Sequence, residues 1–157
     1  MTRSEYGDPD VLTVAEIPTP TPAADEVLVR VDATTVNRTD GGILQARPFV
    51  IRLFTGLRRP KSRVPGTDFA GEVVQTGSAV TDFSGGDRVW GFDDNGLASQ
   101  ALFLTIRQDA AIAKVPPAID DAQAAASAEG APPSGVGRCP RGGRRRRRRL
   151  LALSPMR

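Results

Sequence analysis

Alternating apolar and polar residues predict a β-strand over Glu26–Ala33. Val27, Val29 and Val31 fall on one face of this segment, and a period of two is typical of a strand whose faces meet different surroundings. Further strands are expected where short apolar runs lie next to turn-forming glycine or aspartate. These runs are Phe69–Thr76, Arg88–Phe92, Ala98–Ile106 and Ala111–Val115. We expect the last two to pair with each other around Arg107–Asp109.

Two segments have the features of helices. Asn37–Gln45 is a short candidate. Asp120–Gly130 is a stronger one, because Asp120 is a good N-cap, Gln123 follows three residues later, and the alanine-rich run ends at glycine. Many short strands between glycine turns, with few helices, predict a mainly β fold with short helices, either a small barrel or a sandwich.

Charge is distributed unevenly along the chain. The 157 residues carry a net charge of +3, but residues 132–157 hold nine arginines and no acid, so residues 1–131 carry 3 − 9 = −6. This length suits one domain with a tail. No apolar run approaches the length of a membrane span, and the N-terminus does not resemble a signal peptide. We therefore expect a cytoplasmic protein with no membrane partner.

Two residue types limit the chemistry that this chain can perform. Histidine is absent, which excludes imidazole bases, Ser–His and Cys–His pairs, and the His-based zinc motif. Cys139 is the single cysteine, which excludes an internal disulfide and a zinc site built from several thiolates.

Six short segments, in a fixed order, carry a resemblance to a known family. They are Tyr6-Gly7-x-Pro9-x-Val11-Leu12, Pro18–Pro22, Glu26–Ala33, Val36-Asn37-x-x-Asp40, Pro65-Gly66-x-Asp68-x-x-Gly71 and Gly86-Asp87-Arg88-Val89. With these segments the sequence resembles the N-terminal, GroES-like domain of medium-chain dehydrogenases/reductases, in particular zinc-independent quinone and enone reductases and related alcohol dehydrogenase-like proteins. The resemblance covers roughly residues 5–131 and implies a GroES-like β-barrel over residues 1–131.

The resemblance also implies a reaction. In the family, hydride passes from NADPH or NADH to a quinone, enone or carbonyl held between this domain and a nucleotide-binding half. Zinc-dependent relatives have cysteine and histidine where this sequence has Asn37 and Thr67, and an amide and a hydroxyl are poor zinc ligands. The resemblance therefore implies NADP or NAD as cofactor, no zinc, a small-molecule substrate and, as an option, a homodimer.

Asn37, Asp40 and Thr67 are the candidate catalytic residues. Without a metal, the oxyanion formed by hydride delivery needs hydrogen-bond donors, which Asn37 and Thr67 offer, while Asp40 lies near enough in sequence to orient them. The alternative is structural: Asn37 caps the short helix and Asp40 stabilises its first turn.

The segment Arg47–Arg63 combines basic and apolar residues. By resemblance it lies near the mouth of the substrate cleft, where Phe49 and Phe54 would line the cleft and Arg58 and Arg59 would face an anionic group. The alternative is a surface loop with a few core anchors and solvated charges.

The resemblance ends near residue 131, where the family continues with a Rossmann nucleotide-binding domain. Residues 132–157 have no strand and glycine-rich turn that would cradle a pyrophosphate, so the Rossmann domain is predicted to be absent. We interpret these residues as a disordered, Arg-rich tail translated out of frame, and we expect the truncated chain to be inactive alone. The start also lacks the apolar strand with which relatives usually open.

An alternative function comes from the tail. Arg144–Arg149 would attract nucleic acid or another anionic surface, which would make the protein a non-catalytic binding protein. The tail has no interleaved aromatic residues for base stacking, so nucleic acid is not the partner that we expect.

Overall fold

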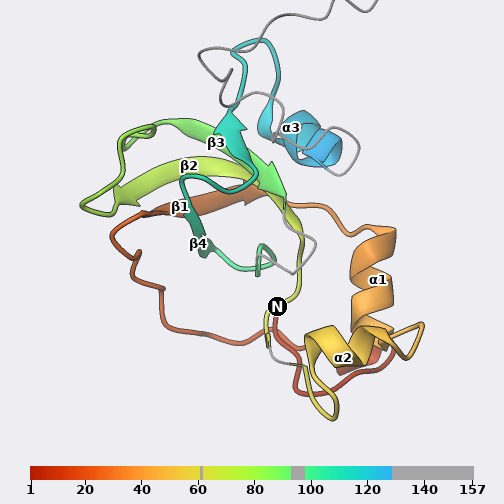
Figure 1. Ribbon diagram of the computed structural model, residues 1–157. Coiled ribbons are helices and arrows are strands. Elements are labelled where there is room, and N and C mark those ends of the chain that lie inside the picture. Colours follow the sequence, from red (N-terminus) through yellow and green to blue (C-terminus); the bar gives the residue numbers. More distant parts are fainter. Residues whose placement is uncertain (61, 93–97, 129–157) are drawn as a thin grey trace, which may run out of the picture.

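A computed structural model describes residues 1–60, 62–92 and 98–128, apart from the side chains of Ile51 and Phe54. These residues form five strands and four short helical segments (Figure 1). The strands are β1 (Glu26–Ala33), β2 (Asp68–Thr76), β3 (Arg88–Phe92), β4 (Phe103–Arg107) and β5 (Ile112–Lys114). The helices are the 3-10 turn η1 (Pro9–Val11), α1 (Arg38–Gln45), α2 (Ile51–Thr55) and α3 (Asp121–Ala128). The prediction of a mainly β fold with short helices is confirmed.

The strands form one antiparallel sheet in the order β4-β1-β2-β3-β5. The expected pairing of the last two strands is wrong, because β4 pairs with β1 and β5 pairs with β3. In the observed register, Ile106 lies opposite Val27 and Leu104 lies opposite Val29. This arrangement buries the apolar residues of β4 against those of β1, which a local hairpin with the short β5 could not do.

One face of the sheet encloses the main core. Valine, leucine, isoleucine and phenylalanine side chains from all five strands pack there, together with Phe83 from the β2–β3 connection. Val27 and Val29 are fully buried and Arg30 and Asp32 are exposed, as the alternation predicts, but Leu28, predicted on the same face as Arg30, is also buried. The inward residues stabilise the sheet by removing apolar surface from water.

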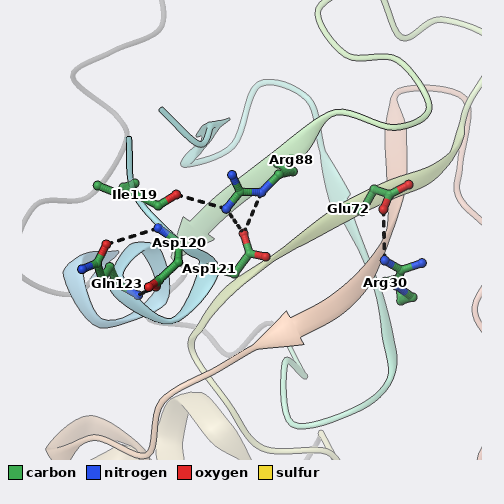
Figure 2. A network of polar contacts seen from close by, with 7 residues as sticks. All are labelled: Arg30, Glu72, Arg88, Ile119, Asp120, Asp121 and Gln123. Carbon is green, nitrogen blue, oxygen red and sulfur yellow. Dashed lines mark hydrogen bonds and ion pairs between the residues drawn. The ribbon is translucent and has the colours of Figure 1, made fainter. Parts of the chain in front are cut away.

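Helix α3 covers the other face of the sheet. Its buried Ala124 and Ala125 pack against Ala70 and Val115 in a second, smaller core. Arg88 of β3 ties the helix down through hydrogen bonds of 3.1 and 2.6 Å to Asp121 (Figure 2). These contacts fix the helix across β2 and β3.

The N-terminus of α3 has the predicted capping box. Asp120 Oδ1 accepts a hydrogen bond from Gln123 N at 2.7 Å, and Gln123 Oε1 accepts one from Asp120 N at 3.2 Å (Figure 2). Such a reciprocal pair satisfies amide groups that a helix start leaves without partners. The helix was expected over Asp120–Gly130, and it extends to Ala128 at the limit of the described residues.

Helices α1 and α2 form a lobe beside the sheet (Figure 1). The N-terminal segment joins this lobe to the rest of the domain, since Arg3 Nη1 donates to Ile43 O at 3.0 Å and Gly7 N to Leu44 O at 3.1 Å. The sequence predicted α1 but not α2, which lies in the segment expected at the cleft mouth or, as the alternative, in a surface loop. Helix α2 lies between Pro48 and Gly56 and has only five residues, which is too few to show a helical period in the sequence.

Gly71 lets β1 and β2 approach each other. A Cβ at this position would collide with the carbonyl oxygen of Arg30 on the neighbouring strand. Backbone cannot move aside as a flexible side chain can, so the close pairing of β1 and β2 requires glycine here.

Residues 132–157, predicted to form a disordered tail, lie outside the described part of the chain. Among the described residues, no helix is long and apolar enough to cross a membrane.

We predict that Gly71→Ala destabilises the domain by about 3 kcal/mol, because the added methyl group forces two paired strands apart. Gly85→Ala is the matched control, since a Cβ there has no atom within 4 Å, and it should change the free energy of unfolding by less than about 0.5 kcal/mol. Urea unfolding followed by circular dichroism measures both. Equal stabilities of the two variants would contradict the close-approach argument.

The stability that Asp87 contributes to the domain should depend on pH. Hydrogen bonds from Lys114 Nζ at 2.7 Å and from Ser84 N at 2.8 Å lower the pKa of the Asp87 carboxyl below 3.8. A lowered folded-state pKa means that this carboxylate contributes stability above its unfolded pKa, and that the contribution is lost as pH falls through the folded pKa.

Asp87→Asn should therefore cost about 1 kcal/mol at pH 7. The difference from the parent should shrink as pH falls below about 4, because protonation then weakens the same bonds in the parent. Urea midpoints measured across this range provide the test, with Asp10→Asn on the exposed turn η1 as control. A pH-independent difference would show that the charge of Asp87 is not the cause.

Candidate functional site

The first residue of β2, Asp68, is a fully buried carboxylate. Its Oδ1 accepts a hydrogen bond from Thr35 N at 2.7 Å, and its Oδ2 accepts one from Thr35 Oγ1 at 2.6 Å. A buried carboxylate is costly unless hydrogen bonds replace its lost water. These bonds join the start of β2 to the segment that follows β1.

Asn37 connects this carboxylate to helix α1. Its Oδ1 caps the helix by accepting from Asp40 N at 2.9 Å, and Asp40 Oδ2 accepts from Asn37 N at 3.1 Å. Its Nδ2 donates to Thr67 Oγ1 and to Asp68 Oδ2, each at 3.0 Å. The capping interpretation is confirmed. Both amide hydrogens are engaged, so Asn37 can donate to a substrate oxygen only by exchanging one of these bonds.

The three predicted catalytic residues form one cluster. Thr67 Oγ1 lies 3.4 Å from Asp40 Oδ1, and both residues are buried, with 1% and 6% of their surface exposed. Asn37 is only partly buried and is the most accessible member of the cluster. Thr67 accepts a hydrogen bond from its amide, and Asp40 accepts one from its backbone N–H.

Arg3 is a buried cation that interacts electrostatically with Asp40 of the cluster. Desolvation by burial lowers the pKa of the Arg3 guanidinium, while the charges of Tyr6 and Asp40 act in the opposite direction. Arginine nevertheless stays protonated at neutral pH. Its positive charge attracts the Asp40 carboxylate, which accepts the hydrogen bonds described above.

An apolar groove of about 910 Å³ is lined by Thr34 and Val36 of the segment after β1, but not by Asn37, Asp40 or Thr67. One wall is the extended segment Val14–Pro20, and the other is formed by the end of β1 and by residues 99–103. Thr34 and Ser99 line the groove, and their hydroxyl oxygens lie 3.0 Å apart. Thr34 Oγ1 also donates to the backbone carbonyl oxygen of Asp68 at 2.8 Å, so the groove wall is joined to the backbone at the start of β2.

Gly66 shapes the base of this region. Its φ of +107° is unfavourable for other residues, and a Cβ would collide with Ser99 Oγ. Glycine therefore allows the segment before β2 to lie directly against Ser99.

The predicted substrate-cleft residues lie elsewhere. Phe49, Arg58 and Arg59 are exposed on the α2 lobe and are not among the residues lining the groove. The side chain of Phe54 lies outside the described part of the structure. The structure thus brings Asn37, Asp40 and Thr67 together, but like the predicted cleft residues they are not among the residues that line the groove.

Sequence reasoning did not single out Asp68, Thr34, Thr35 and Ser99 as site residues. Asp68 gave a usable signal, because an acid directly before an apolar strand is unusual unless it has buried partners. The two threonines and the serine gave none, since such residues are common in loops.

The donor set does not suit a metal ion. Among residues 1–60, 62–92 and 98–128, no group of three or more His, Cys, Asp or Glu residues could hold one. The described residues also lack the usual cradle for a dinucleotide pyrophosphate. Every strand pair in this part of the chain is antiparallel, whereas a pyrophosphate cradle is built on parallel strands joined by a helix.

Comparison with known proteins gives a consistent result. The family profile described as the alcohol dehydrogenase GroES-like domain matches residues 23–105. The chloroplastic quinone-oxidoreductase homolog of Spinacia oleracea is 35% identical over 123 residues, which are 76% of this chain and 35% of that protein. The chloroplastic NADPH-dependent alkenal/one oxidoreductase of Arabidopsis thaliana is 35% identical over 129 residues, 78% of this chain and 32% of that protein.

Solved structures agree with these relatives. Escherichia coli quinone oxidoreductase complexed with NADPH superposes with a TM-score of 0.64 at 30% identity, over 80% of this chain and 36% of that one. The Coxiella burnetii quinone oxidoreductase gives a TM-score of 0.68 at 27% identity, over 79% and 38%. The chain thus spans about a third of the length of the proteins that it matches. It belongs to the alcohol dehydrogenase GroES-like domain family, within the quinone oxidoreductase-like medium-chain dehydrogenases/reductases.

Proposed function

We propose that this chain is the substrate-side part of a zinc-independent, NADPH-dependent oxidoreductase that reduces a quinone, enone or carbonyl. The observation that carries the proposal is the position of Asn37, the partly buried member of a polar cluster. The apolar groove is linked to this cluster through Thr34, which lines the groove and donates to Asp68 O. Two similar proteins support the choice of cofactor, since one is named as NADPH-dependent and the other was solved with NADPH.

In this proposal the chain binds and orients the hydride acceptor. The apolar walls of the groove take the ring or chain of the substrate and exclude water, which strengthens any hydrogen bond formed there. Asn37 donates to the substrate oxygen after its amide releases Thr67 or Asp68. Thr34 and Ser99 offer further hydroxyl groups along the same wall.

In this proposal NADPH supplies the hydride. The described residues offer no cradle for its pyrophosphate, so the nucleotide-binding part has to be supplied outside them. We therefore propose that residues 1–128 recognise the acceptor but do not turn it over alone.

The first test separates acceptor binding from cofactor binding. The full chain is titrated with a cyclic enone, followed by saturation-transfer NMR, and with NADPH, followed by nucleotide fluorescence. We expect the enone to bind and NADPH not to bind, with no NADPH oxidation in the presence of both. Saturable NADPH binding with turnover would overturn the proposal that residues 1–128 do not turn the acceptor over alone. Absence of enone binding would overturn the proposal that they recognise the acceptor.

A variant series tests whether the Asn37 amide holds the cluster. Asn37→Ser keeps a good N-cap but removes the donor to buried Asp68, and should cost about 2 kcal/mol. Asp120→Ala removes only a surface cap, and should cost about 1 kcal/mol. Urea unfolding ranks the two variants, and enone titration of each folded variant measures binding.

In this series, enone affinity should fall for Asn37→Ser and stay unchanged for Asp120→Ala. Equal affinities would show that Asn37 serves the fold alone.

A further inference from the structure

One wall of the apolar groove has a backbone that is not paired. Residues 14–17 follow Thr13, which pairs with Thr2 in an isolated antiparallel bridge through backbone hydrogen bonds of 2.7 and 2.9 Å. Within the described part of the chain, residues 14–17 make no backbone hydrogen bond. A row of such N–H and C=O groups beside a strand-like bridge can pair with an added strand. The groove therefore suits an extended peptide segment.

Large apolar side chains along the groove are uncovered. Val14, Ile17 and Leu102 line it and have 92%, 46% and 77% of their surface exposed. Val14 and Ile17 come from one wall of the groove and Leu102 from the other. An apolar occupant between the two walls would remove all three side chains from water.

The side chains along the groove carry negative charge. Glu16 and Asp32 line it, and none of the described lysines and arginines does. Asp32 is paired with Arg30 at 3.3 Å, and the Met1 ammonium, which also lies at the groove, donates to Gln100 O at 2.5 Å. Glu16 remains to attract a cation. An occupant with positive charge beside its apolar residues is therefore complementary to the groove.

The C-terminal part of this chain contains a segment with both properties. Residues 144–149 are six arginines, and Leu150, Leu151 and Leu153 follow directly. In an extended conformation Leu151 and Leu153 fall on one face, because they are two positions apart. Residues 132–157 carry +9 and residues 1–131 carry −6, so the two regions attract each other.

The chain is long enough for this segment to reach the groove. Ala128 ends helix α3 and lies 150 − 128 = 22 positions before Leu150. A chain of this length spans up to about 70 Å, whereas a domain of this size is only about 35 Å across. Tethering also holds the segment at about millimolar effective concentration, so weak contacts are enough to populate a docked state.

We propose that residues 144–153 dock into the groove as an added strand. Leu151 and Leu153 enter between the apolar walls, the backbone pairs with residues 14–17, and the arginines lie near Glu16. Because the proposed function places the acceptor in the same groove, docking competes with acceptor binding. The competition rests on the proposed function, whereas the docking does not. Docking replaces the expectation of disorder for these residues, and it holds even for a tail translated out of frame, since composition and length alone carry it.

A spin label on the tail tests docking directly. Cys139 is the single cysteine, so Cys139→Ser with Ala152→Cys places a nitroxide within the docking segment of the full chain. Paramagnetic broadening of amide NMR signals should be strong for residues 14–17 and 99–103. Residues 77–80 are the internal control, because Gly77 N donates to Glu26 O at the opposite end of β1. Their signals should stay sharp.

Variants of the tail and of the groove have matched controls. Serine in place of Leu150, Leu151 and Leu153 removes the apolar contacts without changing charge, and the control is Val136→Ser with Met156→Ser in the same tail. In the groove, Glu16→Gln is matched by Glu5→Gln, an exposed acid that does not line it. The broadening should fall at least about fivefold for the leucine variant and about twofold for Glu16→Gln, and it should be unchanged in both controls. Circular dichroism checks the fold of each variant.

Enone titration of the unlabelled chain tests the competition. If the tail occupies the groove for about nine-tenths of the time, the leucine variant should bind the enone about tenfold more tightly than the natural chain. The tail control should bind it as the natural chain does. Docking with equal enone affinities would overturn the competition. Docking without enone binding by either chain would overturn the proposed function and leave the docking in place.

Three results would overturn the docking itself, whatever the enone titration gives. The first is absence of broadening along the groove in the labelled chain. The second is equal broadening in the leucine variant and its control, since the tail would then be held by its charge alone. The third is broadening that disappears on dilution together with a dimer in light scattering, because the segment would then come from a second copy.

Discussion

The buried carboxylate of Asp68 is the constraint on which the rest of the site depends. Its oxygens accept hydrogen bonds from Thr35 and Asn37, and these bonds tie the start of β2 to the segment between β1 and α1. A carboxylate removed from water must keep such donors, since each lost bond leaves a charge without compensation. The position of helix α1 and of the Asn37 amide therefore follows from one buried group.

In the proposed function, Asn37 links the stability of the fold to substrate recognition. Asn37 is the cap of α1, a donor to Asp68 and the least buried member of the cluster. A substrate oxygen that takes a hydrogen bond from this amide has to compete with an internal acceptor. Only an acceptor on which negative charge develops competes well, because hydrogen bonds to charged groups are stronger. Such an arrangement favours binding that strengthens as charge builds up on the substrate.

The sheet and the α2 lobe differ in how their apolar surface is covered. The sheet is covered on one face by its core and on the other by α3, so its apolar surface is satisfied internally. The α2 lobe is held through Tyr6 but leaves apolar and basic side chains outward. The sheet and the α2 lobe are thus separate parts of the domain (Figure 1).

Local patterns in the sequence determined the elements that depend on neighbouring residues. The alternation of Glu26–Ala33 and the capping pairs Asn37–Asp40 and Asp120–Gln123 operate over a few positions, so they could be read directly. Tertiary structure alone decided that β4 pairs with β1 and that Asp68 receives its donors from Thr35 and Asn37, over thirty positions away. Such partners are chosen by the burial of surfaces distant in the chain, which no local period records.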